Sequence, residues 1–162
     1  MPSIRTDIVD VYVARTVPSP GEGDDETFEF LQLLRARDPM NATWQPVMGH
    51  IEPKETAVDC AWRELKEEIG LAQDDPRLVG VWALDAVHPF YLAASDSIVM
   101  SPQFLVLMDT VFTPRLNHEH SDERWVTEVA EFMWPSQRAG VHRALEVLRS
   151  RDSLATDALR IK

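Results

Sequence analysis

The stretch from Gly49 to Leu71, GHIEPKETAVDCAWRELKEEIGL, carries the strongest structural signal in this chain. Between Ala57 and Ile69 it contains neither glycine nor proline, and Gly70 follows where a left-handed residue commonly ends a helix. Thr56, with Asp59 three residues later, is typical of a capping box at a helix start. The sequence therefore predicts a helix of about three to four turns over Ala57–Ile69.

Two kinds of side chain share this predicted helix. Its apolar residues recur at the spacing of a buried stripe, formed by Val58, Ala61, Trp62, Leu65 and Ile69. Glu64, Glu67 and Glu68 fall in one arc beside that stripe. Carboxylates on one face repel one another, and oxygen ligands of this kind suit Mg²⁺ or Mn²⁺. A solvated glutamate face is the alternative, but Glu55 and a glycine-containing turn just before the helix favour a metal site.

Arg63 and Cys60 lie on the same predicted helix. Arg63 could orient Glu55 or a helix carboxylate through a bidentate hydrogen bond, or it could be an ordinary surface arginine. Cys60 is either a small packed residue, which we favour, or a reactive thiol near the carboxylates. With one cysteine in the chain, an intramolecular disulfide is excluded.

Length and composition predict one globular domain over residues 1–162, because the chain is 44% hydrophobic and 27% charged. The net charge of −11 disfavours a nucleic-acid polymer as partner, since its phosphates need Lys and Arg. No apolar run reaches transmembrane length, and the first residues lack the pattern of a signal peptide. We therefore expect a cytoplasmic protein that binds no membrane and is a monomer or a homodimer.

Hydrophobic alternation and turn residues predict six strands outside this helix, at Ile4–Val17, Phe28–Arg37, Trp44–Met48, Leu78–Val87, Ile98–Thr113 and Arg124–Val126. We expect Pro102 to disturb the fifth strand. The segment His88–Ser97 is ambiguous, and Pro114–Glu123 is predicted to be a polar loop.

The C-terminal part is predicted to be helical. Thr127–Phe132 could form a short helix, and Pro135–Arg151 is clearly amphipathic. Asp152–Lys162 is expected to be frayed or to add a short helical turn. Strands followed by a helix, more strands and a final helix indicate a mixed α/β or α+β sandwich.

The motif itself resembles the signature of the Nudix hydrolases. That signature is Gly, five residues, Glu, seven residues, Arg-Glu, an aliphatic residue, any residue, Glu-Glu, any residue, Gly and an aliphatic residue. Every specified position is filled between Gly49 and Leu71. The resemblance implies a mixed β-sheet sandwiched between helices. It also implies metal-assisted cleavage of a nucleoside diphosphate linked to another group.

Other segments resemble the branch that hydrolyses dihydroneopterin triphosphate and dATP. They are Trp44-Gln45-Pro46-Val47-Met48-Gly49, Glu119-His120 followed by Trp125, Trp134 with Arg138, and Leu33-Leu34-Arg35. In that branch, the residues matching Glu64, Glu68 and Glu119 bind magnesium. The arginine that matches Arg35 contacts the substrate, with Arg37 as a nearby substitute.

The expected metal ligands are therefore Glu64, Glu67, Glu68 and Glu119, together with a backbone carbonyl near Gly49. One glutamate must also take a proton from the attacking water. We favour Glu64 or Glu67 for this role, and the sequence leaves the choice open. Arg63 is grouped with these catalytic residues.

Two residues depart from the family pattern and put the choice of substrate in doubt. Met48 replaces a small or polar residue before the motif glycine, and Lys54 replaces a frequent glycine in the motif loop. Aromatic residues that could stack on the substrate are Trp44, Trp82, Phe90, Tyr91 and Trp134.

The sequence thus predicts a magnesium-dependent pyrophosphohydrolase. Its substrate would be a small phosphorylated molecule resembling a nucleoside triphosphate, and its products a monophosphate and pyrophosphate. Hydrolysis of a dinucleoside polyphosphate or a nucleotide sugar is the alternative within the enzyme class. A nucleotide-binding sensor without catalysis is the alternative outside it, although no signature glutamate is missing.

Overall fold

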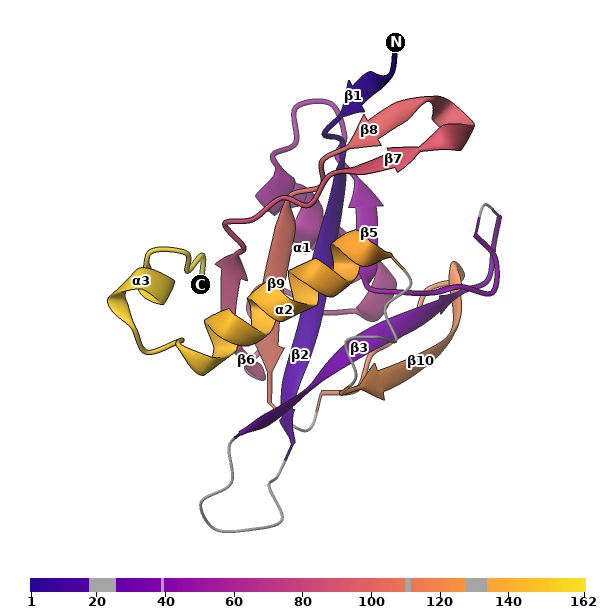
Figure 1. Ribbon diagram of the computed structural model, residues 1–162. Helices are drawn as coiled ribbons and strands as arrows, with labels where there is room; N and C mark the ends of the chain where they lie inside the picture. Colours follow the sequence, from indigo (N-terminus) through magenta and orange to yellow (C-terminus); the bar gives the residue numbers. More distant parts are fainter. Residues whose placement is uncertain (18–25, 39, 110–111, 128–133) are drawn as a thin grey trace.

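The computed structural model describes residues 1–17, 26–38, 40–109, 112–127 and 134–162 (Figure 1). Its strands are β1 (Ser3–Arg5), β2 (Ile8–Val17), β3 (Thr27–Arg35), β4 (Trp44–Gln45), β5 (Val47–His50), β6 (Leu78–Ala83), β7 (Phe90–Leu92), β8 (Ser97–Val99), β9 (Gln103–Met108) and β10 (His120–Val126). Its helices are α1 (Ala57–Ile69), α2 (Pro135–Arg149) and α3 (Leu154–Asp157), with a 3-10 turn, η1 (Ala93–Ser95).

A mixed sheet organises the molecule. Its main strands run in the order β10-β3-β2-β9-β6, with β4 paired to β3 and β5 paired to β2. The β2–β9 pair is parallel, and the other pairs of this sheet are antiparallel. A smaller sheet, in the order β1-β8-β7, lies at one end of the molecule (Figure 1).

Helices cover both faces of the main sheet. Val9, Val11 and Val13 on β2 pack in one cluster with the apolar stripe of α1. Tyr12 and Ala14, which alternate with them, belong to a second cluster with residues of α2. Figure 1 shows α2 crossing in front of β2, with α1 behind. The predicted arrangement of a mixed sheet between helices is thus confirmed.

Helix α1 has the predicted bounds and caps. The Thr56 hydroxyl accepts from the backbone N–H of Asp59 at 3.2 Å, and the Asp59 carboxylate accepts from the Thr56 N–H at 3.2 Å. Gly70 ends the helix with φ of 71°, a left-handed conformation that glycine adopts without a Cβ clash.

Two predicted strands are each divided between the two sheets. The strand predicted over Ile4–Val17 is interrupted at Thr6-Asp7, where Arg5 bonds to the Asp7 carboxylate and the chain passes from β1 to β2. The strand predicted over Ile98–Thr113 becomes β8 and β9, separated at Pro102 as expected.

Other boundaries also differ from the predictions. The sequence predicts a loop that includes His120–Glu123, but these residues belong to β10, because they continue the antiparallel ladder along β3. β3 ends at Arg35 and β6 ends at Ala83, both earlier than predicted. In the short helix predicted over Thr127–Phe132, Thr127 is not helical, and the remaining residues lie outside the described part.

The C-terminal segment is held against the sheet rather than frayed. After the short helix α3, the backbone N–H of Ile161 donates to the carbonyl of Val81 at 2.7 Å. The Val81 N–H donates in turn to the carbonyl of Lys162 at 2.7 Å. The expected extra helical turn is therefore present, and the tail covers the outer edge of β6. Within the described residues, no helix is long and apolar enough to cross a membrane.

Candidate active site

A cavity of about 500 Å³ opens where α1, β3, β5 and the start of β10 meet. Its lining is Ile8, Arg35, Met40, Gln45, Met48, Gly49, His50, Ile51, Glu52, Pro53, Arg63, Glu64, Glu68 and Glu119. Acidic and basic side chains thus share one recess with an apolar wall.

Two of the three predicted helix glutamates line this cavity. Glu64 and Glu68 are 9% and 3% exposed. The side chain of Glu67 is 56% exposed and lines a separate hollow beside Trp62 and Lys66. The helix therefore directs two carboxylates into the cavity and places the third at its outer side.

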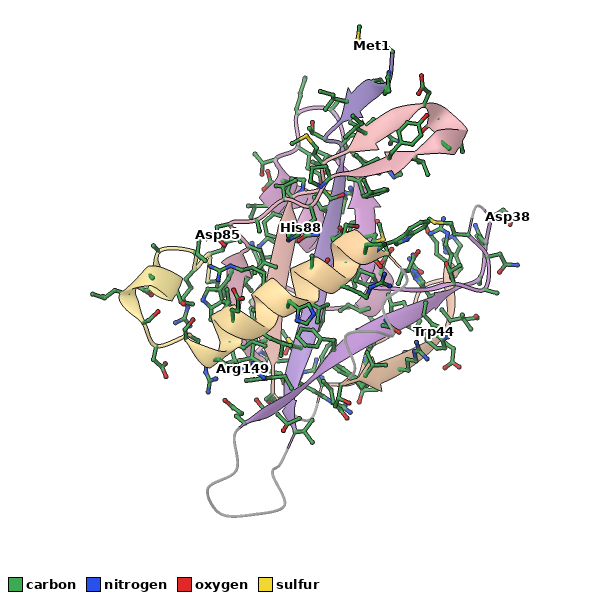
Figure 2. All side chains as sticks on the ribbon, viewed as in Figure 1. Met1, Asp38, Trp44, Asp85, His88 and Arg149 are labelled. Carbon is green, nitrogen blue, oxygen red and sulfur yellow. The ribbon has the colours of Figure 1, made fainter. Side chains whose placement is uncertain are left out.

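Glu119 reaches the same cavity through the pairing of β10 with β3. His120 pairs with Arg35 in that ladder, and the Glu119 carbonyl accepts from the N–H of Ala36 at 2.8 Å. Glu119 Oε2 lies 3.5 Å from Arg35 Nη1. The structure thus brings together Glu64, Glu68, Glu119 and Arg35. Arg37 is exposed and does not line the cavity. Asp38, the residue after it, lies at the loop beyond β3 (Figure 2).

Gly49 allows the backbone of β5 to approach the helix carboxylate. A Cβ atom at Gly49 would lie 1.9 Å from Glu64 Oε1, a distance that no side chain tolerates. This close approach places the backbone around Gly49 beside Glu64, as expected for a carbonyl ligand. Glycine is required here for space, not for an unusual backbone angle.

Arg63 joins several acceptors at the cavity rim. Its guanidinium donates to both carboxylate oxygens of Glu55, at 2.9 and 3.1 Å, and to Glu64 Oε1 at 2.6 Å. It also donates to the carbonyl of His50 at 2.8 Å, and lies 3.4 Å from Glu67 Oε2. The predicted bidentate contact with Glu55 is therefore present, and Arg63 fixes the helix against the loop before it.

The cavity carboxylates are destabilised in their charged forms. Burial, followed by the charge of Glu64, raises the pKa of Glu68 well above its ordinary value. Burial also raises the pKa of Glu64, against the opposing hydrogen bond from Arg63. Glu68 Oε2 is buried without a hydrogen-bond partner. Buried oxygens that repel one another, one of them unpaired, suit a divalent cation.

The described residues do not form a preassembled cluster of three acidic, cysteine or histidine ligands. The ion pairs explain this arrangement: Arg63 holds one oxygen of Glu64, and Arg35 lies beside Glu119. Coordination by Glu64, Glu68 and Glu119 would require these side chains to turn toward a common point. These carboxylates are oxygen donors that fit a divalent cation. They would come together when the cation binds.

Comparison with known proteins gives the family. A protein-family model described as "NUDIX domain" matches residues 18–145, which is most of the chain.

The chain belongs to the Nudix family.

Three known proteins illustrate what this Nudix chain is similar to. It is 29% identical to the mouse protein "Bis(5'-nucleosyl)-tetraphosphatase [asymmetrical]" over 103 residues, covering 64% of the chain and 67% of the relative. An Ap4A hydrolase structure from C. elegans matches with a TM-score of 0.67 and 19% identity, over 89% of this chain and 98% of that one. The E. coli dihydroneopterin triphosphate pyrophosphohydrolase matches with a TM-score of 0.61 and 18% identity, over 86% and 97%.

These matches confirm the predicted family, fold and enzyme class, a Nudix hydrolase acting on phosphoanhydride bonds. The two structural matches show the shared fold. The substrate branch stays a prediction, as do the individual roles of the site residues.

The Nudix loop of this chain contains a strained residue. Lys54, which stands where the family frequently has glycine, has φ of 77°. A residue with a Cβ is unfavourable in this left-handed region. The departure noted in the sequence thus falls at a position whose backbone conformation favours glycine.

Cys60 is a packed residue in this Nudix helix. It is fully buried in the core cluster beneath α1, and burial together with the charge of Glu55 raises the pKa of its thiol to about 12. A thiol with this pKa stays protonated near neutral pH and is a poor nucleophile. The packed interpretation is the one that the structure supports.

The sequence did not identify the apolar wall of the cavity. Ile8, Met40, Met48 and Ile51 form it. Met48 is marked by its departure from the family pattern, whereas the apolar character of the other three is indistinguishable in the sequence from that of core residues. None of the five aromatic candidates lines the cavity in the described residues. Gln45 also lines it, with its amide 3.4 Å from the ring of His120.

Proposed function

We propose that this protein is a magnesium-dependent pyrophosphohydrolase that cleaves a nucleoside triphosphate-like substrate to a monophosphate and pyrophosphate. The observation that carries the proposal is the convergence of three carboxylates and an arginine on one cavity. Glu64, Glu68, Glu119 and Arg35 come from three separate parts of the chain and line the same recess. A polyphosphate chain needs this combination of metal-binding oxygens and a cationic donor.

The metal ligands would be Glu64, Glu68 and Glu119, with a backbone carbonyl beside Gly49 and with Glu67 at the outer side. When bound there, Mg²⁺ or Mn²⁺ would activate water and neutralise charge on the phosphate oxygens. The buried, mutually repelling carboxylates described above support the proposal that a divalent cation binds here.

Arg35 would bind a substrate phosphate. Its side chain is 20% exposed at the cavity, where its planar guanidinium can donate two parallel hydrogen bonds to one phosphate. Its present contact with Glu119, at 3.5 Å, is long enough to be exchanged for a phosphate contact.

Glu64 is our choice for the residue that takes the water proton. It lines the cavity, whereas Glu67 points to the adjoining hollow. Burial raises the pKa of Glu64, which favours proton transfer to a carboxylate oxygen that does not bind the cation. Arg63 positions Glu64 and opposes that shift through its 2.6 Å hydrogen bond.

Hydrolysis of a dinucleoside polyphosphate is the second candidate. The mouse relative is named for the asymmetrical cleavage of a bis(5'-nucleosyl) tetraphosphate. The same cavity would bind the phosphate chain of either substrate. The two candidate substrates differ in the group that is attached to the far end of that chain. A catalytically inactive sensor remains as the control hypothesis for the experiment below.

The experiment is a substrate panel with purified protein and Mg²⁺, reading phosphate and pyrophosphate separately. Nucleoside triphosphates, dihydroneopterin triphosphate, dinucleoside tetraphosphates and nucleotide sugars form the panel. Pyrophosphate release from a triphosphate supports the first candidate, and a dinucleoside tetraphosphate cleaved in preference supports the second. Binding of nucleotides without hydrolysis of any compound would favour the sensor.

We also propose that residues 1–162 form one Nudix domain, since the C-terminal tail and the segment that joins the smaller sheet to β9 both bond to the main sheet. Ile161 and Lys162 pair with Val81 on β6, and the N–H of Asp10 on β2 donates to the carbonyl of Pro102, which follows β8. The formal net charge of −11 supports a small metal-bound substrate rather than a nucleic-acid polymer. A cytoplasmic location is the setting that we propose for this reaction.

A further inference from the structure

A group of buried polar side chains lies where the first turns of α2 meet strands β2 and β9. Asp10, Gln103, Ser136 and Gln137 are each at most 6% exposed. Each carries a side-chain oxygen without a hydrogen-bond partner. Unmade hydrogen bonds at buried oxygens are costly, and several of them in one region call for a physical explanation.

Contacts between β2, β9 and α2 hold this group together. The amide nitrogen of Gln103 lies 3.5 Å from Asp10 Oδ2 and 3.1 Å from the hydroxyl of Tyr12. A Cβ at Gly140 would approach the Tyr12 hydroxyl to 2.3 Å and Gln103 Oε1 to 2.7 Å. The helix therefore rests directly on these polar atoms, and glycine provides the space for them.

Met48 connects this group to the catalytic cavity. It pairs with Asp10 across the β5–β2 ladder, so both side chains share one face of the sheet. Its sulfur lies 3.5 Å from the amide nitrogen of Gln137, and its side chain lines the cavity. Ile8, two residues before Asp10 on the same face, lines the cavity as well. One flexible thioether side chain thus stands between the cavity and the buried oxygens.

Three of the four unpaired atoms are carboxylate or amide oxygens, which only accept hydrogen bonds, and these three define the ligand; the Ser136 hydroxyl can also donate. Gln103 turns its amide nitrogen to Asp10 and Tyr12, so its carbonyl oxygen is left without a donor. Asp10 Oδ1 and Gln137 Oε1 also lack donors. A matching ligand must present adjacent N–H groups. The edge of guanine has a ring N–H beside an amino group, whereas adenine offers an amino group alone on that edge.

We propose that Met48 is a gate to a base-recognition subsite in which Asp10, Gln103 and Gln137 bind a ring bearing adjacent N–H and NH₂ groups, as guanine does. The inference rests on the proposed function, which supplies a nucleoside phosphate to the cavity. To that function the inference adds the identity of the base in the substrate. Burial raises the pKa of Asp10 to about 6, so that the carboxylate is largely ionised, and accepts hydrogen bonds, above neutral pH.

The test is calorimetric titration of the whole protein with GMP and with AMP, which requires no hydrolysis. We expect wild-type protein to bind GMP about tenfold more tightly than AMP, or better. Asp10→Asn, which keeps the shape but removes the carboxylate, should bring the two affinities close together. Met48→Ala should tighten GMP binding by opening the gate, while Met48→Leu, of similar volume, should not.

Asp85→Asn is the matched control. It is the same carboxylate-to-amide change at an exposed residue that pairs with Arg143 on α2, outside the cavity. Its preference for GMP should equal that of wild type. If Asp10→Asn does not fold by circular dichroism, Gln137→Leu replaces it and must reduce the same preference.

Equal binding of GMP and AMP by wild-type protein would overturn the inference, as would an unchanged preference in Asp10→Asn or Gln137→Leu. The substrate panel reads the proposed function independently. Triphosphate hydrolysis without base preference would leave that function standing and refute the subsite. A preference for GMP in a protein that hydrolyses nothing would support the subsite and refute the function.

Discussion

Arg35 and Glu119 are 84 residues apart in the chain, yet Arg35 Nη1 lies 3.5 Å from Glu119 Oε2 inside the cavity. The contact follows from the β3–β10 ladder, in which His120 pairs with Arg35. The pairing of β10 with β3 therefore places the side chain of Glu119 near the cavity face of α1, although Glu119 and α1 are far apart in the sequence. This placement distinguishes Glu119 from the other acidic residues of the same segment.

Glu119→Gln should weaken metal activation and leave the fold intact. The change removes a charge facing Glu64 and Glu68, so the Mg²⁺ concentration for half-maximal hydrolysis should rise about tenfold or more. Glu123→Gln is the matched control, because Glu123 lies farther along β10 and does not line the cavity. Equal small effects from the two changes would show that Glu119 is a solvated acid.

Arg63→Lys should reduce turnover although it keeps the positive charge. Lysine cannot donate to both oxygens of Glu55 while also holding Glu64, so the carboxylate that we assign as base would lose its orientation. We expect kcat to fall by about tenfold to a hundredfold, with KM changing less. Steady-state kinetics measure this, and a wild-type kcat in the variant would exclude the positioning role.

Lys54→Gly should stabilise the protein modestly. Relief of the positive φ is worth about 1 kcal/mol, part of which is offset by the greater freedom of glycine in the unfolded chain. Urea unfolding would measure the change, with Lys54→Ala as the control that keeps the Cβ. A loss of stability in Lys54→Gly would mean that the lysine side chain makes a contribution larger than the strain.

Asp10 should make stability fall as pH rises from about 4 to about 6. The folded-state pKa of about 6 lies above the ordinary value of 3.8, so the folded state holds its proton more tightly across this window. The resulting penalty at higher pH is about 3 kcal/mol at most. Asp10→Asn should flatten this part of the profile and be the more stable protein at pH 8. Parallel pH profiles of unfolding free energy for the two proteins would refute the assignment.

The motif helix and its acidic face could be predicted because their signals are local. Thr56, Asp59 and Gly70 define the helix ends through contacts within a few residues, and the stripe of apolar residues defines the buried face. The direction of Glu67 could not be predicted in the same way. It depends on where β5 and the loop before the helix lie, which the helical period alone does not contain.

The cavity wall and the second polar group depend on pairing between distant strands. Asp10 stands in the β-branched run of β2 and could have been noticed as a polar residue in an apolar strand. Its partners Met48 and Gln103 come from β5 and β9, and the gap at Gly140 is set by α2. Only the sheet register and the helix position together show that these residues meet.

The most direct test of the central claim is a Mn²⁺ titration of wild-type protein and Glu68→Gln, with free Mn²⁺ counted by electron paramagnetic resonance. Glu68 and its neighbours are proposed to bind the divalent ion that the hydrolysis requires. We therefore expect wild-type protein to take up Mn²⁺ and to be active with it. Folded Glu68→Gln should bind Mn²⁺ at least about tenfold more weakly and lose most of its turnover. Identical Mn²⁺ binding and turnover in the two proteins would contradict this assignment of Glu68.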